Sequence, residues 1–296
     1  MRFNSRIRFP AGSVTAALLL TIGLSVSALP ETAPVPDEEF TREVIEKHLA
    51  SIGTEEARSK VESMTVAGTS KAVFKGRGTG ETSGLVVMAS QGKSNLIGMK
   101  FNTPDYPHEK MGYDGKDFTV GFISPGNRSP MGDFLRMNDK TFEVGIMGGV
   151  LSTSWELLGY DSKRGKLDCD DGTTKVDGEE MFKCRYRPKK GSDLRIEVFF
   201  AKDTFRHRRT EYSRVDSARQ GASIDESARQ SETRYKMVEE FSNFSAENGL
   251  TFPHTYVLFL EVQSNQGSWL YRWEMELQQF QFNNSIDPKE FKVDSY

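Results

Sequence analysis

The feature that most constrains the fold is the segment from Trp269 to Phe282. Large apolar residues occupy every second position of its first part, namely Trp269, Tyr271, Trp273, Met275 and Leu277. The residues between them are polar, apart from Leu270. Since successive side chains of a β-strand point to opposite faces, this alternation predicts a long strand with one apolar and one solvated face.

The alternation changes phase at Gln278–Gln279, after which Phe280 and Phe282 occupy the apolar positions. One extra residue in a strand has this effect, so the sequence predicts a β-bulge. The same two-residue period recurs upstream in Tyr256, Leu258, Leu260 and Val262, and in Leu194, Ile196, Val198 and Phe200. Several such strands predict a mainly β (α+β) fold with an extended, mostly antiparallel sheet.

The N-terminus has the pattern of an export signal. Arg2, Arg6 and Arg8 precede a short apolar stretch, Val14–Val26, that ends in the small-x-small sequence Val26-Ser27-Ala28. We therefore predict a signal peptide over 1–28, cleaved after Ala28. An uncleaved N-terminal anchor is the alternative, although the apolar stretch is short for a membrane span.

The amino-acid composition limits which kinds of partner the exported chain can bind. Removing the three arginines of the leader reduces the 39 basic residues to 36 against 42 acidic ones, so the formal charge moves from −3 to −6. An acidic exported protein lacks the excess of basic residues that is typical of nucleic-acid-binding proteins. Residues 29–36 carry three prolines and predict a linker, which leaves 37–296 as one domain.

The mature chain is predicted to begin with helices and to continue as a meander of strands. Asp37 can cap a helix that ends near Ile52, and the spacing of Phe40, Val44, Ile45, Leu49 and Ile52 places these residues on one side of it. A second helix runs from Thr54 to about Val61. Alternation and turn residues predict strands near Met64–Lys75, Thr82–Ala89, Asn95–Asn102, Tyr106–Tyr113, Phe118–Phe122, Trp155–Tyr160, Gly165–Asp170, Glu180–Tyr186, Asp193–Phe200, Phe205–Arg214, Arg234–Phe244, Leu250–Gln263 and Ser268–Phe282.

Two segments interrupt the strands. The stretch of about 130–151 is too dense in apolar residues for a solvated loop, and we interpret it as a helical insert of one or two helices. The stretch of about 213–231 is polar and repeats a Ser-Ala-Arg-Gln sequence, which favours an exposed hairpin extension. A finger that binds a partner is the alternative for this extension.

The only cysteines, Cys169 and Cys184, lie in segments that can pair as a hairpin through Val176-Asp177-Gly178-Glu179. An exported protein permits a disulfide between them, and two unpaired thiols are the alternative. No histidine lies near enough in sequence to complete a metal site with them.

No sequence motif indicates catalysis. The four histidines are scattered, and we expect His207 to be a surface or half-buried residue. The glycine-rich stretch 76–84 fits neither of the phosphate-loop patterns and links two strands. Paired carboxylates can converge from anywhere in a chain, but nothing points to such a pair. We therefore predict no enzyme, no metal and no cofactor.

A curved sheet lined by aromatic residues and methionines, with few covering helices, either leaves an apolar concavity or packs shut as an ordinary core. A resemblance favours the concavity. Segments at both ends of the mature chain resemble the outer-membrane lipoprotein-sorting (LolA/LolB-like) superfamily, particularly an uncharacterised bacterial branch. These segments are residues 43–53, 61–68, 247–254 and 282–291, with looser matches at 113–116 and 176–178.

The resemblance implies an open half-barrel with a few lid helices over an apolar cavity, a periplasmic location and carriage of acyl chains. It carries over no functional residue, and the insert and the extension make this chain longer than a typical carrier of the superfamily. We expect a monomeric, non-catalytic carrier of a lipid or of the acyl chain of a lipoprotein. The predicted cavity residues are Met131, Phe134, Leu135, Met147, Trp155, Tyr256, Leu258, Trp269, Tyr271, Trp273 and Met275.

Two other functions stay open at this point. The chain could be a structural or interaction protein that meets an envelope partner through the sheet edge or the polar extension. It could also be a hydrolase of lipid or glycan, for which the sequence offers only carboxylates without a location.

Overall fold

The computed structural model describes residues 38–190, 193–217 and 232–293. The described elements all belong to one unit, Val35–Tyr296. The predicted signal peptide, the linker and Asp37 lie outside the described residues, as does most of the polar extension.

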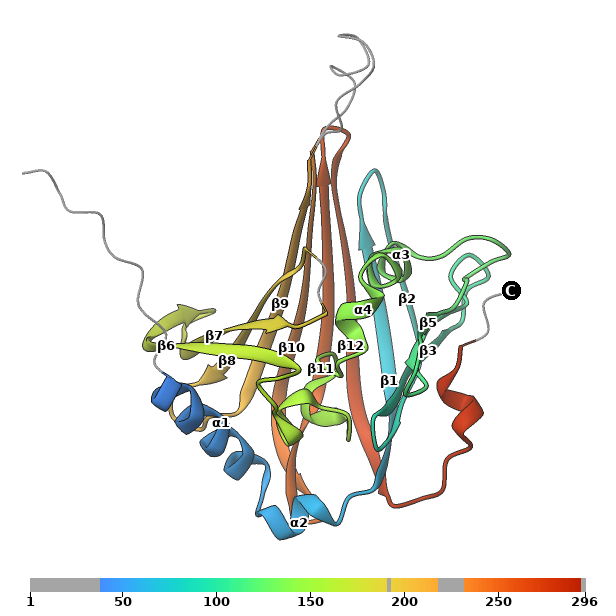
Figure 1. Cartoon of the computed structure of the whole chain (residues 1–296). Helices are drawn as coiled ribbons and strands as arrows, with labels where there is room; N and C mark the ends of the chain where they lie inside the picture. The colour runs from blue at the N-terminus through green and yellow to red at the C-terminus, as the bar shows by residue number, and fades with distance from the viewer. Residues whose placement is uncertain (1–37, 191–192, 218–231, 294–296) are drawn as a thin grey trace, which may run out of the picture. The chain divides into compact units, whose positions relative to one another are not determined.

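Twelve strands form one antiparallel sheet in the order β5-β4-β3-β2-β1-β12-β11-β10-β9-β8-β7-β6 (Figure 1). The only neighbours in this order that are not consecutive in the chain are β1 and β12, which join the two halves at the centre. The strands are β1 Ser63–Lys75, β2 Thr79–Gln91, β3 Ser94–Phe101, β4 His108–Tyr113, β5 Phe118–Val120, β6 Gly165–Val176, β7 Glu179–Pro188, β8 Arg195–Ala201, β9 His207–Asp216, β10 Thr233–Glu247, β11 Leu250–Ser264 and β12 Gly267–Phe282.

The predicted long strand and its bulge are confirmed in β12. In the pairing of β1 with β12, Ala67 lies opposite Gln279 and Gly68 lies opposite Leu277, so Gln278 is the extra residue. Trp273, Met275 and Leu277 are buried before the bulge, and Phe280 and Phe282 pack against the core after it. The bulge therefore keeps apolar side chains on one face along the whole strand.

One predicted strand is wrong. Trp155–Tyr160 contains instead the 3-10 helix η2, Glu156–Gly159. Its backbone forms turn bonds in place of a ladder, since the N–H of Trp155 donates to the carbonyl of Ser152 and that of Leu158 donates to the carbonyl of Trp155. The apolar residues of so short a segment cannot distinguish a strand from a tight helical turn.

The N-terminal helices are confirmed as α1 (Glu38–Ile52) and α2 (Glu55–Ser59). The Thr54 side chain caps α2 by accepting from the N–H of Ala57. α1 buries Val44, Ile45 and Ile52 as its spacing predicts, and it also buries Thr41 and His48, which the apolar pattern does not mark.

The predicted helical insert is confirmed as α3 (Pro130–Met137), α4 (Asp139–Phe142) and the 3-10 helix η1 (Gly149–Leu151). It connects β5 to β6, which are the two edge strands of the sheet. The sheet is therefore not closed into a barrel, and the insert crosses from one edge to the other. Most of its apolar side chains belong to the same buried cluster as those of the sheet and α1, whereas Met137 is exposed.

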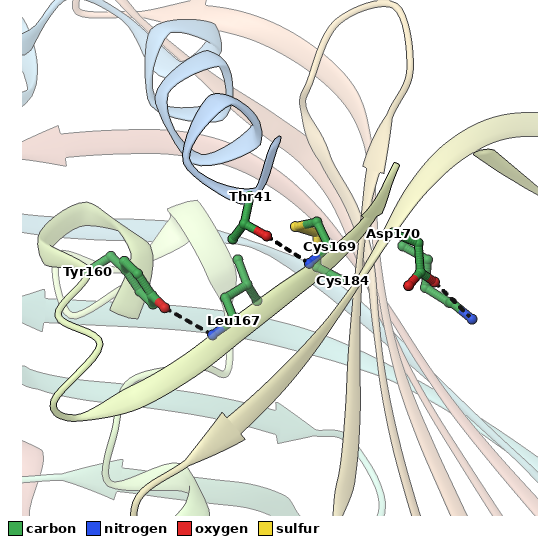
Figure 2. The surroundings of a disulfide bond; sticks show 7 residues. Thr41, Tyr160, Leu167, Cys169, Asp170 and Cys184 are labelled. Atoms are coloured by element: carbon green, nitrogen blue, oxygen red, sulfur yellow. Dashed lines mark hydrogen bonds and ion pairs between the residues drawn. A yellow bond between two sulfur atoms is a disulfide. The ribbon is translucent and has the colours of Figure 1, made fainter. Parts of the chain in front are cut away.

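The Cys169–Cys184 disulfide is confirmed, and the two residues lie directly opposite each other in β6 and β7. The Asp177-Gly178 turn between these strands has positive φ at both residues, 50° and 91°, as a two-residue hairpin requires. Side chains also cover the free edge of β6. Thr41 accepts from the N–H of Cys169 and Tyr160 accepts from that of Leu167, both at 3.0 Å (Figure 2).

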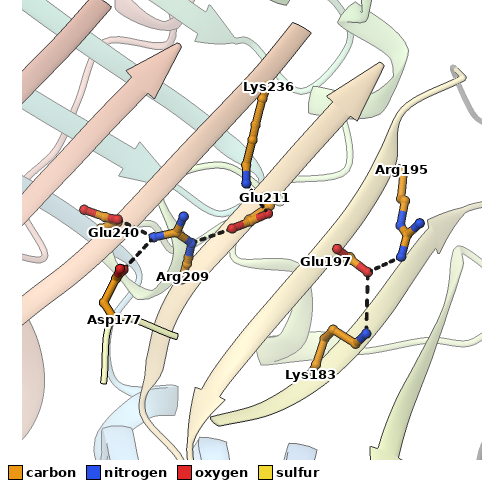
Figure 3. A network of polar contacts seen from close by, with 8 residues as sticks. All are labelled: Asp177, Lys183, Arg195, Glu197, Arg209, Glu211, Lys236 and Glu240. Atoms are coloured by element: carbon orange, nitrogen blue, oxygen red, sulfur yellow. Dashed lines mark hydrogen bonds and ion pairs between the residues drawn. The ribbon is translucent and has the colours of Figure 1, made fainter. Parts of the chain in front are cut away.

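The outer face of β7–β10 is held by ion pairs. Arg209 contacts Glu211, Glu240 and Asp177, and Glu197 lies between Arg195 and Lys183 (Figure 3). A small second core lies on the other half of the sheet, where Phe291 of the 3-10 helix η3 (Pro288–Phe291) and Val293 pack against Leu96.

Candidate functional site

The structure brings most of the predicted cavity residues together, but it packs them tightly. Nine of the eleven are buried members of one continuous cluster: Met131, Phe134, Leu135, Met147, Trp155, Tyr256, Leu258, Trp273 and Met275. Tyr271 is partly buried and packs against this cluster. Trp269 is also partly exposed and lies apart, with its indole beside Gly76. The hollows described below are not lined by any of the eleven.

Three of these aromatic residues donate hydrogen bonds to buried polar groups. The indole N–H of Trp155 donates to Nε2 of His48 at 3.1 Å, and that of Trp273 donates to the hydroxyl of Tyr106 at 2.9 Å. The hydroxyl of Tyr256 donates to Glu239 at 2.6 Å. The concave side of the sheet therefore carries a polar network as well as an apolar core.

Glu239 is the centre of this network. Its side chain is fully buried in β10, and it accepts from the hydroxyls of Tyr212 and Tyr256 and from the N–H of Gly148 in the insert. Burial raises the pKa of Glu239 to about 7, while these three hydrogen bonds act in the opposite direction. The contact with Gly148 ties the insert to the sheet.

Glu109 repeats this arrangement on β4. Its carboxyl accepts from the hydroxyl of Tyr106 at 2.6 Å, and Tyr106 in turn accepts from Trp273. Burial raises the pKa of Glu109 to about 7 as well. A general acid needs access to a substrate, and neither Glu109 nor Glu239 lines a described hollow.

Two histidines connect α1 to the insert. His48 lies between the carbonyl of Phe205 and the indole of Trp155, so it is the neutral tautomer with its proton on Nδ1. The prediction of a surface or half-buried His207 is wrong, because this residue is 1% exposed and its ring stacks on Trp155 with centroids 4.8 Å apart. Burial lowers the pKa of His48 to about 4 and that of His207 well below its usual value.

No motif in the sequence indicates the two buried carboxyls, although their positions carry a signal. Tyr235, Met237, Glu239 and Phe241 share one face of β10, and Glu109 shares a face with Met111. A carboxylate on the apolar face of a strand indicates a buried hydrogen-bonding group. The partners that satisfy Glu239 come from β9, β11 and the insert, and no local pattern identifies them.

The largest described hollow lies elsewhere. It is a groove of about 610 Å³ between α1–α2 and one end of the sheet, and we call it the α1–α2 groove. Its apolar walls are Leu49, Ile52, Val61, Met64, Val150, Leu158, Leu250 and Phe252. Its polar residues are Glu46, Glu55, Arg58, Ser59, Ser152 and Thr153. Its volume falls within the range of about 300–1,000 Å³ that is common for ligand sites.

Fixed hydrogen bonds hold the walls of this groove. Arg58 donates to the carbonyls of Leu49 and Gly53, which ends α1 and sets its angle with α2. On the opposite wall, the N–H of Thr153 donates to Ser90 and its hydroxyl donates to the carbonyl of Gly92. Leu158 is 37% exposed on the rim, whereas Met64 and Phe252 are buried at the base.

Comparison with known proteins gives fold similarity only. No protein-family model matches the chain, and no curated protein matches its sequence. Among solved structures, it is similar to a LolA superfamily protein from Nitrosomonas europaea, with 12% identity, 85% of this chain and 96% of that chain covered, and a TM-score of 0.43. It is also similar to a putative outer membrane lipoprotein-sorting protein domain from Vibrio parahaemolyticus, with 15% identity, coverage of 83% and 97%, and a TM-score of 0.41.

A DUF1329 family protein from Desulfovibrio piger is similar with 11% identity, coverage of 85% and 96%, and a TM-score of 0.38. At these identities and TM-scores the likeness concerns the fold, and function has to be inferred from the residues of this chain. None of the helices in the described ranges is long and apolar enough to span a bilayer.

Proposed function

We propose that this protein binds an acyl chain of a lipid or lipoprotein in the α1–α2 groove and carries it through the periplasm without catalysis. The observation that carries the proposal is the groove itself, which has eight apolar wall residues and an open, polar rim. Transfer of a chain from water into such walls contributes about 0.8 kcal/mol per buried methylene.

The construction of the groove favours a flexible apolar ligand. Met64 and Phe252 at the base offer a polarizable and an aromatic surface, and both suit irregular apolar contacts. Glu46, Glu55 and Arg58 remain on the rim, where a polar head of the ligand would stay in water. The acyl chain would enter beside Leu158 and lie between α1 and Val150.

The proposal places the ligand away from all of the predicted cavity residues. Their side chains are engaged with one another and with the insert, so a ligand among them would require the insert to leave the sheet. The α1–α2 groove needs no such movement. Val150 and Leu250 connect the two regions, because they line the groove and belong to the buried cluster.

Binding of cis-parinaric acid, a fluorescent fatty acid, tests the proposal. Leu49→Glu places a charge on a half-buried wall of the groove and should weaken binding about tenfold or more, because an acyl chain would then meet an ionised group. Leu85→Glu is the matched control, since Leu85 is 61% exposed on β2 and outside the groove. This control should keep the affinity of the unaltered protein.

Mass spectrometry of a solvent extract from mature protein purified without detergent identifies the cargo. A stoichiometric lipid, absent from a control protein, is the expected result. A clean extract together with no binding of cis-parinaric acid by folded, monodisperse protein would overturn the proposal and favour the envelope-interaction hypothesis.

A further inference from the structure

A second hollow, of about 310 Å³, has a different chemistry from the α1–α2 groove. Six basic residues line it: Lys93, Lys140, Lys163, Arg164, Lys189 and Lys190. Of the described residues that line it, two are acidic, namely Glu143 and Glu156. This concentration of positive charge occurs in a chain with a formal net charge of −3. We call this hollow the lysine pocket.

The two acidic residues are already engaged. Lys140 pairs with Glu143 at 2.5 Å, and Arg164 contacts Glu156 at 3.6 Å. Within the described ranges, the ammonium groups of the other four lysines form no ion pair.

The lysine pocket is built on fixed backbone. Gly145 has φ 78°, and a Cβ there would lie 2.1 Å from the carbonyl oxygen of Ser154, so only glycine permits this close approach. Asn95 donates to the hydroxyl of Ser154 at 2.8 Å, and the N–H of Lys189 donates to the carbonyl of Arg164 at 2.9 Å. These contacts bring the β2–β3 turn, the insert and the β6–β7 hairpin to one place.

We propose that the lysine pocket is an anion site that binds a phosphate ester group. Four ammonium groups that form no ion pair with a described residue share this concave wall, and together they produce a positive potential that matches a multiply charged anion. Lysine ammonium groups bind phosphate as point charges, and the planar fork that favours carboxylate is supplied here only by Arg164, which contacts Glu156 and Gly159. Tyr113 and Val144 add an apolar wall for the carbon part of the ester.

The proposal stands independently of acyl binding, although one short segment links the two sites. Ser152, Thr153 and Leu158 line the α1–α2 groove, whereas Ser154 and Glu156 line the lysine pocket. A phosphorylated lipid could therefore supply the ester, and so could a soluble phosphorylated molecule. Both sources present the same group to the lysines.

Phosphorus-31 NMR titration of the full mature protein tests the site with two probes, sn-glycerol 3-phosphate and dihexanoyl phosphatidic acid. We expect saturable binding that Lys93→Gln combined with Lys163→Gln weakens about tenfold. Both lysines are exposed, so this variant should remain folded. Lys75→Gln combined with Lys100→Gln is the matched control, because it removes the same charge from exposed positions outside the pocket.

Tighter binding of phosphatidic acid than of glycerol phosphate, lost in Leu49→Glu, would support the site and identify a lipid source. Equal binding of the two probes would support the site with a soluble source. The absence of saturable binding, or equal weakening in the two double-lysine variants, would overturn the proposal. If the protein binds no acyl chain but still shows the lysine-dependent phosphorus-31 signal, the proposed function fails and the anion site stands. The two failures are therefore distinguishable.

Discussion

The concave interior of the sheet and the α1–α2 groove contain similar apolar residues but differ in what covers them. In the interior, the insert between β5 and β6 fills the space, and Trp155, Trp273 and Tyr256 hold buried polar partners. In the groove, α1 and α2 leave a hollow of about 610 Å³. Apolar residues alone therefore do not identify a ligand site, because other side chains of the same chain can pack against them and occupy the space.

The largest expected effect is in the interior. Trp273→Ala should lower the free energy of unfolding by about 3–5 kcal/mol, since it leaves a large cavity and removes the donor to Tyr106. Urea denaturation followed by circular dichroism measures this. A loss below about 1 kcal/mol would show that Trp273 lies in a space open to ligand and not in a packed core.

The stability of the β6–β7 edge of the sheet should depend on the disulfide. Replacing both Cys169 and Cys184 with alanine should lower the free energy of unfolding by about 3 kcal/mol, because the sequence separation of 15 residues limits the unfolded chain. Thermal and urea denaturation measure this difference when the variant and the reduced unaltered protein are each compared with the oxidised unaltered protein. Equal stability of oxidised and reduced protein would contradict it.

The polar network of the interior should make stability depend on pH. Burial raises the pKa of the Glu239 carboxyl from its ordinary value of 4.5 to about 7, so the folded protein binds the proton more tightly than the unfolded chain does. Stability from this group is full below about pH 4.5 and is lost as pH rises through about 7. Through this group, the free energy of unfolding of the unaltered protein should fall by an amount on the order of 2 kcal/mol between pH 5 and pH 8. Glu239→Gln should abolish this part of the decrease.

Urea denaturation at both pH values, for Glu239→Gln and the unaltered protein, measures this difference. Glu240→Gln on the opposite face controls for the loss of one surface carboxylate. Comparison with the unaltered protein is needed because His48, with a pKa lowered to about 4, acts in the other direction: its contribution is lost as pH falls below 6.5. Parallel pH profiles for Glu239→Gln and the unaltered protein would contradict the role of Glu239.

The smallest effect on folding is expected in the groove. Leu49→Glu should change the free energy of unfolding by less than about 1 kcal/mol, because Leu49 is half-buried and faces an open hollow. The same denaturation assay applies. A loss comparable with that of Trp273→Ala would mean that the groove wall is core, and the comparison between the two regions would fail.

Local patterns of the sequence determined much of the fold. The two-residue period predicted most strands and the bulge at Gln278, and the spacing of Val44, Ile45 and Ile52 predicted α1. Asp177-Gly178 predicted the hairpin that places Cys169 opposite Cys184. These features depend on neighbours in the chain, where backbone geometry and turn chemistry act directly.

Only the tertiary structure decided what occupies the concave side. The pairing of β1 with β12 and the crossing of the insert from β5 to β6 depend on contacts between distant segments. These contacts bury Glu109 and Glu239, stack His207 on Trp155 and fill the predicted cavity with the insert. The groove and the lysine pocket also arise where several distant segments meet, because long-range packing decides which surfaces remain open.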